Sequence, residues 1–227
     1  MSVLISKTMS YINIHTHQLQ KETIIFIYNA ENINFFCYFM GNISYGIHPW
    51  NVSSFDINIE LRNIEDLIIS RKIVALGECG LDRCITTPLQ LQIQVFEQQL
   101  RLAQKYQIPA IIHCVKCYNE IIKIVKDLKL SIPLIIHGYN ANSIITRRLL
   151  TYKNIYFSFG KLLITNIQKS TELLDIISME KIFFETDDDP IAIETIYKCA
   201  SEIKKIPEDV LILQVYNNFI KLFENNV

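Results

Sequence analysis

Short apolar runs alternate with longer stretches of helical spacing along almost the whole chain, and this alternation is the feature that most constrains the fold. Most of the runs are continuously apolar, which is typical of parallel strands that are buried on both faces of a sheet. Repeated strand-then-helix units predict an α/β fold whose parallel sheet is either open or closed into a barrel. We place the strands near residues 11–14, 23–28, 42–47, 72–77, 108–112, 132–136, 154–160 and 181–186.

The stretches between the strands carry the signals of amphipathic helices. The apolar residues between 61 and 68 share one helical face. A second helix is expected from Leu89, with Thr87 as its N-cap and Pro88 in its first position. Residues 18–45 break the pattern, because they have little room for two complete strand–helix units, so we expect the barrel to be trimmed or distorted on its N-terminal side. Further helices are expected near 117–129, 141–152, 166–178, 190–205 and 207–224.

Length and composition favour a single globular domain over residues 1–227. Half of the 227 residues are hydrophobic, and no repeat or linker divides the chain. Residues 1–8 are expected to be a non-essential extension, because Met9 is a plausible start. No apolar run approaches the ~20 residues of a membrane-spanning helix and no secretory signal is evident, so we expect a cytoplasmic protein that does not contact a membrane. In that setting the six cysteines are expected to be reduced thiols.

Every histidine in the chain lies at the carboxyl end of a predicted strand, and two carboxylates lie at equivalent positions. In α/β barrels this end of the strands forms the active-site rim. A lone histidine there is most often structural, but repetition on separate strands favours a metal centre. Imidazole and carboxylate suit zinc, manganese, iron or nickel, and the number of side chains suffices for two ions. The residues are His15, His17, His48, Glu78, His113, His137 and Asp187.

The first two of these histidines form an H-x-H pair directly after a predicted strand. In an extended segment residues i and i+2 point to the same side. His15 and His17 are therefore expected to hold one ion together.

Seven short motifs follow one another from residue 12 to residue 190. They are INIHTH, YGIHPW, ALGECGLD, IPAIIHC, LIIHG, YFSFG and FFETDDDP. In order and spacing they resemble the TatD-type metal-dependent hydrolases of the amidohydrolase superfamily. The resemblance implies a (β/α) TIM-like barrel, divalent metal ions and hydrolysis of phosphodiester bonds, commonly in DNA.

The resemblance also implies two metal sites that share one carboxylate. The ions are expected to be zinc, manganese, magnesium, iron or nickel. Asp187 is expected to orient the attacking water or to accept its proton, and Glu78 to bridge the ions. Position by position, the first site is implied for His15, His17 and Asp187, and the second for His113 and His137, with Glu78 shared between them.

Other residues near the predicted rim are weighed as substrate contacts. His48 is expected either to contact substrate or to hydrogen-bond a loop, and Arg83 to hold a phosphate. Trp50, the only tryptophan, is expected to cover the barrel mouth, with stacking on a base as the alternative. Asp188 and Asp189 are expected to cap a helix that begins near Pro190.

Departures from the family pattern fall on the substrate side. Val115 stands two positions after His113, where the family usually has a basic residue, and HGYNAN and TDDDP replace more usual stretches. Three functions therefore stay open. The leading one is an exonuclease-like deoxyribonuclease, expected to act as a monomer on DNA. The second is a hydrolase of a small amide, ester or lactone, which the net charge of −1 favours. The third is a non-catalytic metal-binding protein.

Overall fold

The computed structural model describes residues 10–37 and 41–223 and shows one parallel sheet whose strands follow sequence order. Neighbouring strands pair in regular register, except for a shift between the first and second strands and another between the fourth and fifth. The predicted α/β class is confirmed. The strands are β1 (Tyr11–Thr16), β2 (Ile24–Asn29), β3 (Ile43–Tyr45), β4 (Ala75–Asp82), β5 (Ala110–Val115), β6 (Leu134–Ile136), β7 (Ile155–Phe159) and β8 (Ile182–Phe184).

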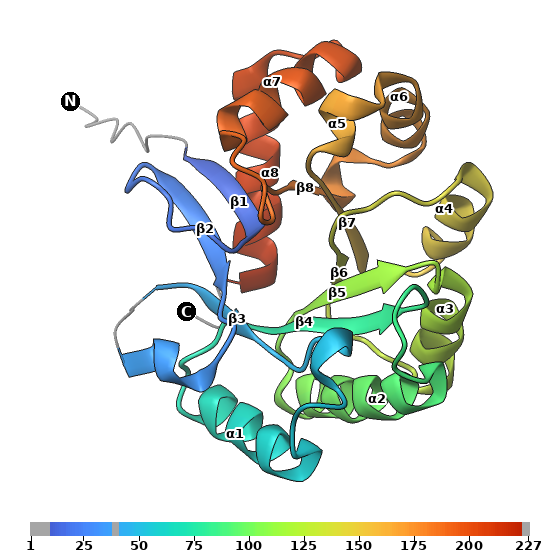
Figure 1. Cartoon of the computed structure of the whole chain (residues 1–227). Helices are drawn as coiled ribbons and strands as arrows, with labels where there is room; N and C mark the ends of the chain where they lie inside the picture. The colour runs from blue at the N-terminus through green and yellow to red at the C-terminus, as the bar shows by residue number, and fades with distance from the viewer. Residues whose placement is uncertain (1–9, 38–40, 224–227) are drawn as a thin grey trace.

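The sheet closes on itself between its first and last strands. Thr16 at the end of β1 forms a parallel bridge with Asp187, three residues beyond β8. The His17 N–H donates to the Asp187 carbonyl at 3.0 Å, and the Asp187 N–H donates to the His15 carbonyl at 3.1 Å. The open-sheet alternative is therefore excluded, and the expected TIM-like barrel is confirmed (Figure 1).

Helices surround the strands (Figure 1). Among the described residues, no helix is long and apolar enough to cross a membrane. Within residues 10–37 and 41–223 there are also three short 3₁₀ helices, η1 (Ile33–Cys37), η2 (Pro49–Asn51) and η3 (Met179–Lys181). The α-helices are α1 (Ile57–Ile69), α2 (Leu89–Tyr106), α3 (Tyr118–Asp127), α4 (Ser143–Leu149), α5 (Leu162–Thr165), α6 (Ile167–Ile176), α7 (Ile193–Lys204) and α8 (Glu208–Phe223).

The N-terminal trimming of the barrel concerns helices rather than strands. Residues 17–23, all of them described, connect β1 to β2 by loop and turn, and η1 follows β2. The expected shortening is thus present, yet β2 and β3 both take their places in the sheet. Residues 38–40 and the predicted extension at 1–8 lie outside the described residues.

Two predicted helix caps are wrong. Pro88, not Thr87, is the N-cap of α2, because its backbone is extended (φ −54°, ψ 130°), and no side chain caps that helix. Helix α7 begins at Ile193 with Ala192 as its N-cap, so Asp188 and Asp189 do not cap it. Three residues of irregular chain, Pro190, Ile191 and Ala192, separate these acids from the helix.

Aromatic packing fixes the seam of the barrel. The Tyr197 ring on α7 packs edge-on against Phe184 of β8 at a centroid distance of 4.6 Å, and both side chains are fully buried. The Tyr197 hydroxyl donates to the Ile12 carbonyl at 3.0 Å and accepts from the Ile12 N–H at 3.1 Å. Burying each such ring contributes roughly 1.5–3 kcal/mol. Helix α7 therefore holds β1 against β8 and sets the position of the residues that follow them.

Candidate metal centre

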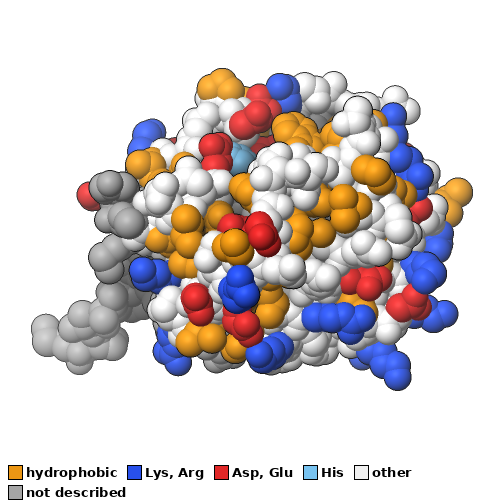
Figure 2. Space-filling model, turned by 60° about the horizontal axis from the view of Figure 1, so that its bottom comes forward, with side chains coloured by type: hydrophobic (Ala, Val, Ile, Leu, Met, Phe, Trp, Pro, Cys, Tyr) orange, Lys and Arg blue, Asp and Glu red, His pale blue; other side chains and the backbone are white. Residues whose placement is uncertain are grey.

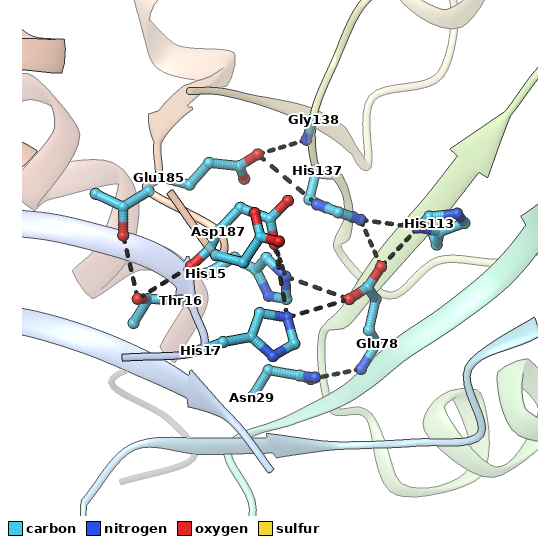
Figure 3. Close-up of polar contacts among 12 residues, drawn as sticks. His15, Thr16, His17, Asn29, Glu78, His113, His137, Gly138, Glu185 and Asp187 are labelled. Carbon is cyan, nitrogen blue, oxygen red and sulfur yellow. Dashed lines mark hydrogen bonds and ion pairs between the residues drawn. The ribbon is translucent and has the colours of Figure 1, made fainter. Parts of the chain in front are cut away.

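The strand ends bring four histidines and two carboxylates to one point on the barrel rim. These residues lie in or after five of the strands, and Figure 3 shows their side chains converging. The topology explains this convergence, because the carboxyl ends of parallel strands lie at the same edge of a barrel. The residues and their elements are His15 in β1, His17 after it, Glu78 in β4, His113 in β5, His137 after β6 and Asp187 after β8.

Glu78 lies at the centre of this cluster and is 6% exposed. Its Oε1 atom is 2.6 Å from His113 Nδ1 and 2.7 Å from His137 Nε2. Its Oε2 atom is 3.4 Å from His15 Nε2 and 3.7 Å from His17 Nε2. The two oxygens of one carboxylate therefore face two separate pairs of histidines.

Asp187 faces the pair of histidines that follows β1. Its Oδ1 atom is 3.3 Å from His15 Nε2 and 3.5 Å from His17 Nε2. The residue has a left-handed backbone (φ 55°), which directs the chain back toward β1 while its N–H and C=O join that strand. The i, i+2 pair of histidines and Asp187 are thus brought together in the structure.

His48 joins the cluster from the loop after β3. Its Nε2 atom is 3.2 Å from Glu78 Oε1, and its Nδ1 atom accepts the Trp50 N–H at 3.3 Å. The structure shows the loop hydrogen bond expected for His48, while its other ring nitrogen faces Glu78, and its contact with substrate stays a prediction. Burial lowers the pKa of His48, which favours the neutral ring.

The chemistry of the donors fits divalent metal ions. Among the described residues, three sets of three donor atoms each lie within 4.8 Å of one another, and all three sets combine imidazole with carboxylate. Buried polar atoms almost always have partners, so a buried ring nitrogen that faces carboxylates without a hydrogen bond indicates a ligand. Within the described part of the chain, His15 Nε2 is such an atom, because it has no hydrogen-bond partner and lies 3.4 Å from Glu78 Oε2 and 3.3 Å from Asp187 Oδ1.

The histidines and carboxylates of the cluster shift one another's pKa values in opposite directions. Burial by itself would lower the pKa of His15, but its contacts with Asp187 and Glu78 outweigh burial and raise it to about 9. For Asp187, burial would raise the pKa, but His15 outweighs it and lowers the pKa to about 2. Burial likewise opposes ionisation of Glu78, yet His137 and the other histidines hold its pKa well below the ordinary value. The carboxylates are therefore ionised and demand positive charge, which a divalent ion supplies.

A pocket of about 460 Å³ opens over the cluster. Among the described residues, its lining contains no lysine or arginine, whereas Glu31 and Asp188 add negative charge. Figure 2 shows a histidine in a hollow between acidic and hydrophobic side chains. The volume is typical of a small-ligand site, and it is large enough for one nucleotide unit.

Arg83, expected to hold a phosphate, and Lys161, which also follows a strand, lie outside the pocket lining. Arg83 does not line it but pairs with Glu120 at 2.5 Å and donates to the Lys116 carbonyl at 3.3 Å. Lys161 pairs with Asp189 at 2.8 Å. The structure therefore does not bring Arg83 to the centre.

Two residues that the sequence reasoning missed hold the centre in place. Asn29 at the end of β2 accepts the Glu78 N–H at 2.7 Å. Glu185, 1% exposed, accepts the Gly138 N–H at 2.5 Å and lies 3.7 Å from His137 Nδ1 (Figure 3). Both are polar residues at a strand end, the signal that identified the histidines, so a wider use of that criterion would have included them.

Comparison with known proteins gives a family match over most of the chain. A sequence model described as TatD related DNase matches residues 29–224. An uncharacterized metal-dependent hydrolase of Mycoplasma genitalium is 31% identical over 150 residues, which cover 63% of this chain and 57% of that protein. The 3′-5′ ssDNA/RNA exonuclease TatD of Yersinia pseudotuberculosis is 34% identical over 101 residues, which cover 43% of this chain and 38% of that protein. The matches thus span less than two thirds of these relatives.

Solved structures share the fold. A TatD homologue from Escherichia coli superposes with a TM-score of 0.84 at 19% identity, covering 96% of this chain and 99% of that one. A TatD family hydrolase from Entamoeba histolytica gives a TM-score of 0.74 at 16% identity, covering 94% and 98%. At these identities the likeness concerns the barrel alone.

Proposed function

The chain belongs to the TatD related DNase family, and from this premise we propose that it is a metal-dependent exonuclease acting on single-stranded DNA. One observation carries the proposal: the two oxygens of Glu78 face separate pairs of histidines at the rim of the barrel. Relatives named as nucleases support the choice of a phosphodiester substrate.

Two divalent ions fit the arrangement, with Glu78 shared between them. When bound, such ions lower the pKa of water toward neutrality and neutralise charge on phosphoryl oxygens. The first ion would be held by His15, His17 and Asp187, and the second by His113 and His137.

Two side chains are assigned to the reacting groups. Asp187 orients the attacking water, because its carboxylate is ionised and partly open to the pocket, and it is the carboxylate placed to accept the proton of that water. His48 is assigned to the scissile phosphate through Nε2, the ring nitrogen that faces Glu78 at 3.2 Å, since Nδ1 accepts the loop N–H.

The two other functions have less support. The absence of lysine and arginine from the described pocket lining is compatible with a small ester or amide, but the named relatives point to nucleic acid. A non-catalytic role would leave an accessible and complete donor set without use. A single domain, a monomeric state and a cytoplasmic location stay predictions.

Metal analysis followed by a nuclease assay tests the proposal. The purified protein is analysed for bound metal and then given 3′- and 5′-labelled single-stranded DNA with manganese or magnesium, with a matched small-ester substrate in parallel. Two equivalents of metal and stepwise loss of nucleotides from one end are expected. Bound metal with hydrolysis of the ester but not of DNA would overturn the choice of substrate, and bound metal with neither activity would support a non-catalytic role.

A further inference from the structure

An exposed tryptophan stands at the mouth of the pocket. Trp50 lies in η2, lines the pocket and is 62% exposed. Its ring meets the His48 ring edge-on at a centroid distance of 4.9 Å and lies 6.4 Å from the His113 ring. The indole is therefore one imidazole away from the Glu78 cluster and has an accessible surface.

A buried carboxylate fixes this indole. Trp50 Nε1 donates to Asp82 Oδ2 at 2.8 Å, and Asp82 is 4% exposed. The other Asp82 oxygen accepts the Cys84 N–H at 2.8 Å. Gln92 holds the Asp82 backbone at both ends, accepting its N–H at 2.8 Å and donating to its carbonyl at 3.0 Å. The ring is thus anchored to β4 and α2 by its polar edge.

The charged side chains that line the pocket do not favour binding of a nucleic acid along its phosphate backbone. Among the described residues the lining offers no basic side chain, and Glu31 and Asp188 repel phosphates next to the scissile one. Anchoring through a base needs no positive charge, because every base presents a flat face to an aromatic ring. A preorganised ring also loses little conformational entropy when a base stacks on it.

We propose that Trp50 is the platform on which the terminal base of the nucleic acid stacks while its phosphate lies over the Glu78 cluster, and that Asp82 is the residue that positions this platform. The inference rests on the proposed nuclease function and adds that substrate is held by its base rather than along its backbone. The base is recognised by its flat face, so the platform accepts all four bases.

Intrinsic fluorescence tests the platform without measuring activity, because Trp50 is the only tryptophan of the chain. Magnesium-loaded protein is titrated with deoxyadenosine 5′-monophosphate and, as the control, with 2-deoxyribose 5-phosphate, which lacks the base. Saturable quenching by the nucleotide and none by the sugar phosphate is expected. Equal quenching by both compounds, or nucleotide inhibition of hydrolysis with unchanged fluorescence, would overturn the proposal.

Kinetics on a matched pair of oligonucleotides gives the second test. One substrate ends in a normal nucleotide and the other in an abasic residue. Trp50→Ala is expected to lower kcat/KM on the normal substrate by roughly 5- to 150-fold and to leave the abasic one nearly unchanged, while Trp50→Phe retains most activity. An equal loss on both substrates, or no loss on either, would contradict stacking. If wild-type protein cleaves neither substrate, the nuclease proposal fails, and the fluorescence titration still decides the platform.

A third comparison tests the positioning role of Asp82. Asp82→Asn keeps an oxygen for the indole N–H, whereas Asp82→Ala removes it. Asp82 Oδ2 also lies 3.6 Å from His113 Nε2, so the readouts are taken at Trp50 itself. The alanine variant is expected to lower the fluorescence anisotropy of Trp50 and to weaken its quenching by the nucleotide, and the asparagine variant to restore both. Unchanged anisotropy in Asp82→Ala would show that the carboxylate does not hold the ring.

Discussion

Asp187 and His15 are joined twice at the seam of the barrel: the Asp187 N–H donates to the His15 carbonyl at 3.1 Å, and Asp187 Oδ1 lies 3.3 Å from His15 Nε2. The first contact closes the sheet, and the second belongs to the candidate metal centre. Because the same residues serve both, an ion bound there would hold the first strand to the last. Metal binding is therefore expected to stabilise the fold as well as to supply chemistry.

Metal removal should lower the melting temperature. Treatment with a chelator is expected to destabilise the protein, and manganese at about 100 times its Kd to restore about 2.7 kcal/mol, because the ion binds only the folded state. Thermal unfolding followed by circular dichroism measures the change. Asp187→Asn should weaken the metal-dependent shift, while Glu22→Gln, an exposed change at the opposite end of the sheet, should retain it. A chelator effect of equal size in both variants would place the stabilising ion elsewhere.

The chelated protein should also lose stability as the solution becomes alkaline. The pKa of His15 is raised from 6.5 to about 9 in the folded protein, so its contribution is complete below pH 6.5 and disappears as the pH rises through about 9. At the acid end, Asp187 contributes above pH 3.8 and loses its contribution as the pH falls toward 2. Urea unfolding between pH 6.5 and 9.5 measures the first effect. With metal bound the ring is neutral throughout, so a decline of the same size in the loaded protein would argue against His15 as a ligand.

The sequence was sufficient to predict that the site residues at the strand ends lie near one another, because the carboxyl ends of parallel strands lie at one edge whatever the conformation of the loops. The i, i+2 rule placed His15 and His17 together, and the resemblance to the TatD-type hydrolases added Asp187 to them. Arg83 shows the opposite case. Its partner Glu120 lies on α3, beyond both α2 and β5, and no spacing rule indicates which way a long side chain turns at a strand end.

Helix starts were harder to predict, because a cap depends on the backbone of one residue. Pro88 was expected inside its helix and instead forms the cap, since its extended ψ of 130° ends the loop. The supporting contacts of Asn29 and Glu185 also depend on the barrel, because each joins residues that are distant in sequence.

Replacing Glu78 should disable the centre. Glu78→Gln removes the negative charge that faces both histidine pairs, so metal content is expected to fall and kcat/KM to drop by at least about 100-fold, since even supporting residues around metal ligands cost 10–100-fold. Elemental analysis and the labelled-DNA assay measure the two effects. Glu22→Gln is the matched control and should behave as wild type. Normal turnover with both ions retained in Glu78→Gln would rule out the bridging role.

Asn29 should matter through the backbone of Glu78. Asn29→Ala removes the acceptor of the Glu78 N–H, and we expect metal affinity to fall about 10-fold with the fold intact. Isothermal titration with zinc measures the affinity. Asn58→Ala, an exposed change on α1, is the control. If both variants bind zinc like the wild type, Glu78 is positioned by other contacts of β4.

Hydrolysis of single-stranded DNA should depend only weakly on salt. Each phosphate neutralised by a lysine or arginine adds about −0.7 to the slope of log affinity against log salt for single strands. Within the described part of the chain, the pocket lining offers no such side chain, and Arg83 is paired with Glu120 outside it. We therefore expect a slope of log kcat/KM no steeper than about −1 between 50 and 200 mM salt, and the same slope in Arg83→Ala. A slope near −3 that becomes shallower in Arg83→Ala would contradict this prediction. It would show that the arginine turns toward the substrate backbone, as the sequence suggested, and that basic side chains bind the strand in addition to the stacking of its terminal base on Trp50.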